Sequence, residues 1–167
     1  TFFNYSPAKP DTAEQKSLSD TASDRRAKQA AKKILAAAET DRGLCVVFGV
    51  GPLLAELARA SDLNIVCVET DAKKIAAARD ALQEEGLYGT RVSILEVESL
   101  QQLPLPSHFA NFVVAQWPFA GESPAGRAAE AFRLLRPSEG KGLFVHSAEG
   151  DQDRVAVPLQ AYFAKDG

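Results

Sequence analysis

The residues of this sequence best suited to chemistry are two glycines at the end of an apolar run. In the stretch CVVFGVGPLLAEL, residues 45–57, the apolar run ends at Gly49 and Gly51, and leucines then recur at helical spacing. Glycine has no Cβ, so the backbone can approach a ligand closely at these positions. A helix that begins here directs its free N–H groups to the same place. The pattern predicts a loop that binds a nucleotide-like cofactor, although tight packing of a strand against a helix would also use glycine.

A carboxylate follows the next apolar run. Residues 64–69 read NIVCVE, so this run ends in Glu69. A carboxylate at the tip of the second strand can accept hydrogen bonds from both hydroxyls of a ribose. An exposed acid in a loop is the alternative, and the spacing from the glycine loop favours the ribose interpretation.

Apolar runs of strand length alternate with segments of helical periodicity along most of the chain. Strands are predicted at 44–48, 64–69, 91–97, 109–116 and 142–147, and helices at 23–38, 52–60, 71–85 and 123–135. Strands that alternate with helices are joined by right-handed crossovers, so we expect an α/β fold with a doubly wound, mostly parallel sheet and helices on both faces. The tail, residues 154–163, has room for one more strand, and Pro158 predicts an edge position for it.

Composition and charge exclude several classes of protein. The chain has 167 residues, of which 46% are hydrophobic, and a net charge of -3, as is typical of one soluble globular domain. A negative net charge does not favour nucleic acid as the main partner. No apolar run is long enough to cross a membrane, so no membrane association is expected. Cys45 and Cys67 lie in apolar runs without a Cys/His cluster, which predicts buried free thiols and no metal site.

The ends of the sequence bear on its domain organisation. Residues 1–22 are rich in small polar residues and lack a sustained period, which predicts a linker or arm, and residues 23–167 form the predicted domain. The chain begins with Thr1 and contains no Met. We therefore expect a domain of a longer protein, in contact with the rest of that chain. No signal peptide is apparent, and the cytoplasm is the favoured compartment.

Four stretches resemble, in order, motifs of the class I S-adenosylmethionine-dependent methyltransferases. The stretch VCVETDAKKIAAAR (66–79) resembles the second strand and following helix of that family, and RVSILEVESLQQLPLP (91–106) its third strand and loop. FANFVVAQ (109–116) resembles its fourth strand, and AAEAFRLLRPSEGKGLFV (128–145) its helix that ends in Leu-Arg-Pro before the fifth strand. The resemblance covers about residues 25–147. It implies a Rossmann-like fold, S-adenosylmethionine as cofactor, and direct displacement of methyl onto an acceptor that the sequence does not identify.

The resemblance also implies which residues bind the cofactor. Gly49 and Gly51 form the binding loop, and Glu69 takes the place of the ribose-binding acid. Glu98 and Ser99 fall where an acid and a small residue lie beside the adenine. A nicotinamide dinucleotide is disfavoured because its loop needs a third glycine where this sequence has Leu54.

Candidates for the transfer site follow the fourth and fifth strands. The residues QWPF (116–119) resemble a degenerate form of the Asn/Asp-Pro-Pro-Tyr/Phe motif of enzymes that methylate amino or amide nitrogens. Gln116 could accept from the target nitrogen, and Trp117 or Phe119 could stack on a planar substrate. His146, at the end of the fifth strand, is the best-placed candidate base. The alternative for QWPF is a strand end with an aromatic lid over the core. The alternative for His146 is a structural role.

The sequence departs from the family in its first motif. Val47 stands where the family usually has an acid, and Leu53 where it has a third glycine. Leu53 is expected to crowd the methionine end of the cofactor. Residues after 147 leave room for one good strand, so the sheet is expected to lack the family's last strands. The alternative function is therefore a catalytically inactive methyltransferase-like scaffold or interaction domain of a larger protein.

Overall fold

The computed structural model of the 167-residue chain describes residues 22–117, 125–137, 140–146 and 155–158. Its helices are α2 (Ala22–Ala38), α3 (Pro52–Ala60), α4 (Ala72–Glu84) and α5 (Ala125–Leu134). Its strands are β1 (Arg42–Phe48), β2 (Asp62–Glu69), β3 (Val92–Glu96), β4 (Phe112–Trp117), β5 (Lys141–His146) and β6 (Val155–Pro158). The predicted arm lies almost wholly outside the described residues and remains a prediction.

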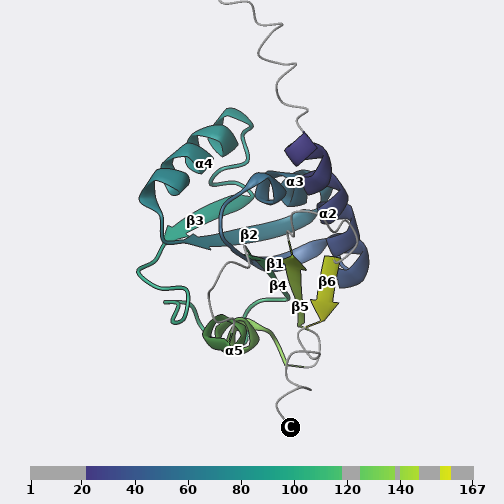
Figure 1. Cartoon of the computed structure of the whole chain (residues 1–167), viewed down its shortest axis with the longest axis vertical. Coiled ribbons are helices and arrows are strands. Elements are labelled where there is room, and N and C mark those ends of the chain that lie inside the picture. The colour runs from purple at the N-terminus through teal and green to yellow at the C-terminus, as the bar shows by residue number, and fades with distance from the viewer. Residues whose placement is uncertain (1–21, 118–124, 138–139, 147–154, 159–167) are drawn as a thin grey trace, which may run out of the picture.

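One six-stranded sheet runs through the molecule in the order β3-β2-β1-β4-β5-β6 (Figure 1). The first five strands are parallel, and β6 pairs antiparallel with β5. This confirms the expected α/β fold with a doubly wound, mostly parallel sheet. The predicted additional strand is also present, and β6 lies at the edge, where the missing N–H of Pro158 is tolerated.

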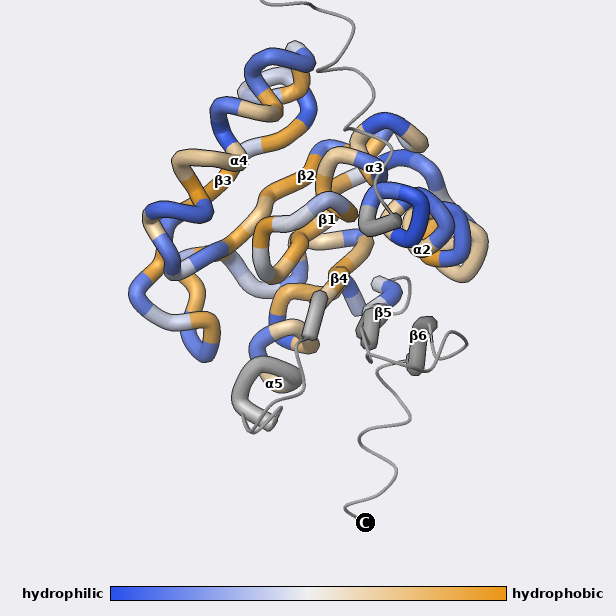
Figure 2. Tube along the Cα trace, turned by 45° about the horizontal axis from the view of Figure 1, so that its top comes forward, coloured by the Kyte–Doolittle hydropathy of each residue, from blue (hydrophilic) through white to orange (hydrophobic). Residues whose placement is uncertain are grey.

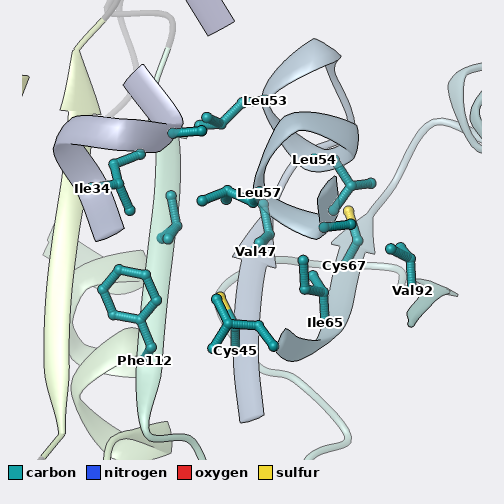
Figure 3. Packing of buried hydrophobic residues seen from close by; sticks show 14 of the residues in the cluster. Ile34, Cys45, Val47, Leu53, Leu54, Leu57, Ile65, Cys67, Val92 and Phe112 are labelled. Atoms are coloured by element: carbon teal, nitrogen blue, oxygen red, sulfur yellow. The ribbon is translucent and has the colours of Figure 1, made fainter. Parts of the chain in front are cut away.

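Side chains of β1 alternate between two apolar cores, one on each face of the sheet. Cys45 and Val47 belong to a cluster with residues of α2, α3 and α4, as Figure 3 shows for part of it. Val46 and Phe48 belong to a second cluster with residues of α5 and of the segment 97–110. Figure 2 shows hydrophobic residues, in orange, along β1, β2 and β4. Alternation with period two therefore places β1 at the centre of the fold.

Both cysteines are free and buried, as predicted. Desolvation by burial is the main cause of their high pKa values, and it raises the pKa of the Cys67 thiol to about 12. The pKa of Cys45 is raised further, by burial and by the neighbouring Cys67. Thiols of this kind act as small apolar side chains rather than as nucleophiles.

A side-chain hydrogen bond joins the beginning of β1 to the residue that precedes β4. The Leu44 N–H donates to Asn111 Oδ1 at 3.0 Å, and the Asn111 N–H donates to the Leu44 carbonyl at 3.0 Å. Gly43 has a left-handed backbone, with φ of +109°, and a Cβ there would lie 2.8 Å from Asn111 Oδ1. The close approach therefore requires glycine at position 43.

Replacing Asn111 by alanine is expected to lower the free energy of unfolding by about 1–3 kcal/mol, because the Leu44 N–H loses its acceptor in a partly buried position. Urea unfolding followed by circular dichroism measures the change. The matched control is Asn64→Ala, which alters an exposed asparagine of β2 and is expected to change stability by no more than about 0.5 kcal/mol. Equal effects of the two substitutions would contradict the assignment.

Candidate cofactor site

The predicted site residues follow the carboxyl ends of neighbouring parallel strands. In the register of the sheet, Phe48 of β1 lies beside Val68 of β2 and Ala115 of β4. The loop after β1 therefore begins level with the ends of both neighbours. Loops that leave the carboxyl ends of adjacent parallel strands form the usual binding crevice of open α/β sheets.

Gly49 and Gly51 shape the loop in different ways. Gly49 has φ of +90°, in the left-handed region that disfavours residues with a side chain. Its N–H donates to the Val68 carbonyl at 2.9 Å, which fastens the start of the loop to β2. Gly51 is the N-cap of α3 and has an extended backbone that any residue can adopt. The backbone conformation therefore requires glycine at position 49. The backbone conformation at position 51 does not require glycine.

The carboxylate of Glu69 joins β2 to the glycine loop. The side chain is only 7% exposed. Its Oε2 accepts from the Val50 N–H at 3.2 Å. Its Oε1 accepts from the N–H groups of Thr70 at 2.8 Å and Asp71 at 3.2 Å. Since each carboxylate oxygen has two lone-pair directions, Oε2 keeps the capacity to accept one more hydrogen bond.

The surroundings of Glu69 keep its carboxyl group ionised. Desolvation by burial acts to raise its pKa, but hydrogen bonds from the N–H groups of Val50, Thr70 and Asp71 and the positive charge of Lys74 together outweigh it. The pKa of Glu69 is therefore lowered below its ordinary value of 4.5. At neutral pH the loop faces a negatively charged acceptor, as the ribose interpretation of Glu69 requires.

The segment that carries Glu98 and Ser99 starts beside Glu69. The Val97 N–H donates to the Glu69 carbonyl at 3.0 Å, so the chain leaves β3 next to the end of β2. Both Glu98 and Ser99 are exposed, and Ser99 Oγ accepts from the Gln101 N–H at 3.1 Å. The structure thus brings together the three predicted cofactor-binding segments.

A partly buried ion pair on α5, between Glu130 and Arg133, holds the rest of this segment, and the sequence analysis did not predict it. The buried Glu130 accepts from the Leu103 N–H at 2.8 Å and from Arg133 Nε at 2.9 Å. Arg133 also donates to the Leu105 carbonyl at 2.9 Å. The hydrogen bond from Arg133 has the largest effect on the pKa of Glu130 and lowers it. Burial acts to raise this pKa but is outweighed. In the sequence, an acid and an arginine three residues apart in a predicted helix were the available signal of this ion pair.

The candidates for the transfer site lie at the same edge of the sheet. In the pairing of β4 with β5, Gln116 lies beside Val145, and Trp117 beside His146. The strand ends that carry these three candidates are therefore adjacent. Phe119 lies outside the described residues.

The two departures from the family's first motif belong to the core. Val47 and Leu53 are both buried in the cluster between the sheet and the helices α2, α3 and α4 (Figure 3). Val47 cannot supply the charge of the missing acid. Core packing accounts for Leu53 without any contact to a cofactor, so the expected crowding remains a prediction.

The described part of the chain shows neither a cluster of metal ligands nor a membrane-spanning helix. No group of three or more His, Cys, Asp or Glu side chains there is arranged to hold a metal ion. None of the helices described is long and apolar enough to cross a membrane.

Comparison with known proteins assigns the family. A family model described as a methyltransferase domain matches residues 44–144, which is more than half of the chain. The chain therefore belongs to this family. At the level of the family, this confirms the expected class of S-adenosylmethionine-dependent methyltransferases and their cofactor. The sequence matches none of the curated proteins with which it was compared.

Solved structures of methyltransferases have the same fold. An S-adenosyl-L-methionine-dependent methyltransferase from Methanococcus maripaludis superposes with a TM-score of 0.70 at 21% identity, over 88% of this chain and 68% of that one. An S-adenosylmethionine-dependent methyltransferase from Aquifex aeolicus has a TM-score of 0.64 at 18% identity, over 87% of this chain and 78% of that one. Geranyl diphosphate C-methyltransferase from Streptomyces coelicolor has a TM-score of 0.66 at 12% identity, over 83% and 53%. The chain spans about half the length of several other structures that it matches.

The hydrogen bonds of Glu69 predict a pH-dependent contribution to stability. Because the folded state lowers its pKa, Glu69 stabilises the fold above the pKa of the unfolded chain, near 4.5, and this contribution is lost as pH falls through the folded pKa. Glu69→Gln is therefore expected to lower the free energy of unfolding at pH 7 by about 1–3 kcal/mol. The difference between wild type and variant is expected to shrink at lower pH.

Urea unfolding at pH 7 and at several values below pH 5 measures this difference. The matched control is Glu84→Gln, because Glu84 is exposed on α4. A difference between wild type and Glu69→Gln that stays constant over the whole pH range would contradict the role assigned to the ionised carboxylate.

Proposed function

We propose that this chain binds S-adenosylmethionine at the carboxyl ends of β1, β2 and β3 and transfers its methyl group to an acceptor held beside β4 and β5. The observation that carries the proposal is the ionised, buried carboxylate of Glu69. It lies next to the left-handed Gly49 and retains acceptor capacity on Oε2. Family membership supports the same activity.

In this proposal each segment of the loop region has a separate role. Glu69 accepts from the ribose hydroxyls, as charge-assisted hydrogen bonds favour. Gly49 has no Cβ, so the backbone can approach the ligand closely there. Its positive φ would also strain any residue with a side chain. Glu98 and Ser99 are exposed next to Glu69, which fits a place beside the adenine.

Methyl transfer needs few dedicated catalytic groups. S-adenosylmethionine would, when bound, supply a methyl group on a sulfonium, and S-adenosylhomocysteine would leave as a neutral thioether. The chain then has to align the acceptor and exclude water. We assign this task to the ends of β4 and β5, with Gln116 as hydrogen-bond acceptor, Trp117 and Phe119 as stacking residues, and His146 as base. The pairing of Trp117 with His146 supports this grouping.

The second candidate is a methyltransferase-like scaffold that no longer binds cofactor. It is favoured by one observation, namely that both first-motif departures, Val47 and Leu53, are buried core residues. An apolar residue at position 47 leaves the positively charged methionine end without its usual partner. The two candidates predict opposite results in a cofactor titration.

Calorimetric titration with S-adenosylmethionine, and separately with S-adenosylhomocysteine, is expected to show binding at micromolar concentration. Glu69→Ala is expected to weaken it by about tenfold to a hundredfold, because the ribose loses its charged acceptor. Glu98→Ala, at an exposed position, provides a second variant that does not depend on the fold of the buried acid. Its effect is expected to be smaller and of the same sign.

Glu84→Ala, which removes an exposed carboxylate from α4, is the matched control and is expected to bind like the wild type. Circular dichroism and thermal unfolding show whether each variant is folded. Wild-type affinity in folded Glu69→Ala would rule out the ribose assignment. Absence of heat and of a thermal shift with wild-type protein at millimolar ligand would favour the scaffold.

A further inference from the structure

A large groove lies on the helical side of the molecule, apart from the transfer site. It has a volume of about 1010 Å³ and is lined by residues of α2, α3 and α4. Figure 1 shows these three helices on the same side of the sheet. The middle helix, α3, has 9 residues, whereas its neighbours α2 and α4 have 17 and 13. The groove is lined by all three helices.

The wall formed by α4 is a regular helical stripe. Its lining residues recur three or four positions apart and are Lys74, Ala77, Ala78, Ala81, Leu82 and Glu85. Ala77 and Ala81 are exposed, whereas Leu82 of the same stripe is buried in the core. Alanines at this spacing allow another helix to approach closely, as in ridge-and-groove packing. The exposed Ala77 and Ala81 leave this stripe of α4 open along the groove.

The floor of the groove is apolar. It is formed by Val50 and by residues of α3 that include Leu54 and Ala55. None of the described residues that line the groove is aromatic. These residues therefore offer no stacking platform of the kind that single-stranded nucleic acids need.

The opposite wall is basic. Arg25, Lys28 and Lys32 of α2 line the groove at helical spacing, and Lys74 faces them from α4. Among the salt bridges of the described residues, none involves these four cations. Among the described residues that line the groove, five are cationic and three acidic, so this lining carries a positive excess in a chain whose net charge is -3.

The acidic side chains at the far end of the groove are already engaged. Arg59 of α3 forms ion pairs with Glu56 and with Glu85 at the end of α4, including a hydrogen bond of 2.8 Å from its Nε. This arrangement closes that end of the groove. On the α2 wall, Arg25, Lys28 and Lys32 outnumber Asp24, so this wall keeps an excess of positive charge.

We propose that this groove is a docking site for an acidic amphipathic helix of a partner protein. An apolar ridge with spacing i, i+3, i+4 and i+7 would pack on the floor and on the alanines of α4. Acidic residues on the flank would meet Arg25, Lys28 and Lys32. A helix of about 13 residues is about 20 Å long, which equals the length of α4. Binding of an amphipathic helix in an apolar groove is a recurrent recognition mode.

A library of displayed helical peptides, selected against the whole chain, tests the proposal without use of any cofactor. We expect the enriched peptides to be net negative and to carry apolar residues at helical spacing. The best peptide, synthesised and titrated, is expected to bind the wild type and to lose about tenfold or more in affinity with Ala81→Arg or with Lys28→Glu/Lys32→Glu. The first variant fills the groove and the second reverses its charge.

Matched controls use exposed residues of the same helices that do not line the groove. Ala76→Arg on α4 and Arg26→Glu/Lys33→Glu on α2 are expected to bind the peptide within about twofold of the wild type. Thermal unfolding checks that all four variants are folded.

Several results would overturn the proposal. These are a selection that enriches no sequence, enriched peptides without acidic residues, and a best peptide that the groove variants and the controls affect equally. A dimer in sedimentation that Ala81→Arg abolishes would assign the groove to a second copy of the chain. Vesicles of phosphatidylserine that Lys28→Glu/Lys32→Glu releases, but Ala81→Arg does not, would assign the basic wall to a lipid surface.

Discussion

The burial of residues 45–48 of β1 is the constraint on which the rest of the structure depends. This strand is hydrogen-bonded to β2 on one edge and to β4 on the other, and apolar clusters cover both of its faces. A strand enclosed in this way cannot shift its register by one residue, because every side chain would then face the wrong core. The position of Gly49, directly after β1, is therefore determined by packing rather than by the loop itself.

Glu69 connects this packing to the proposed chemistry. Burying a carboxylate is unfavourable unless hydrogen bonds replace its water. Here the N–H groups of Val50, Thr70 and Asp71 do so, and one of them belongs to the glycine loop. The same interactions orient the loop and keep the acid ionised. Glu69, on which the proposed cofactor binding rests, thus also links the loop after β1 to the end of β2.

The departures from the family pattern have a common physical basis in the helical core. Val47 and Leu53 fill space between the sheet and the helices, where an acid would lack solvent and a glycine would leave a cavity. Only part of this layer is closed. The groove lined by α2, α3 and α4 remains open, and it combines an apolar floor with a basic wall. Two distinct recognition surfaces, one polar and one amphipathic, therefore meet near the N-terminus of α3.

The sequence by itself determined the order and kind of the elements described here, because periodicity and apolar runs are local properties that burial of one or two faces imposes on each segment. It also placed Gly49 and Glu69 at strand ends, where parallel strands bring them together. It did not disclose that Val50 donates to Glu69, that Glu130 and Arg133 hold the segment after β3, or that three helices enclose a groove. Tertiary structure alone decided these features, since each depends on the distance and angle between segments far apart in the chain, which no local pattern encodes.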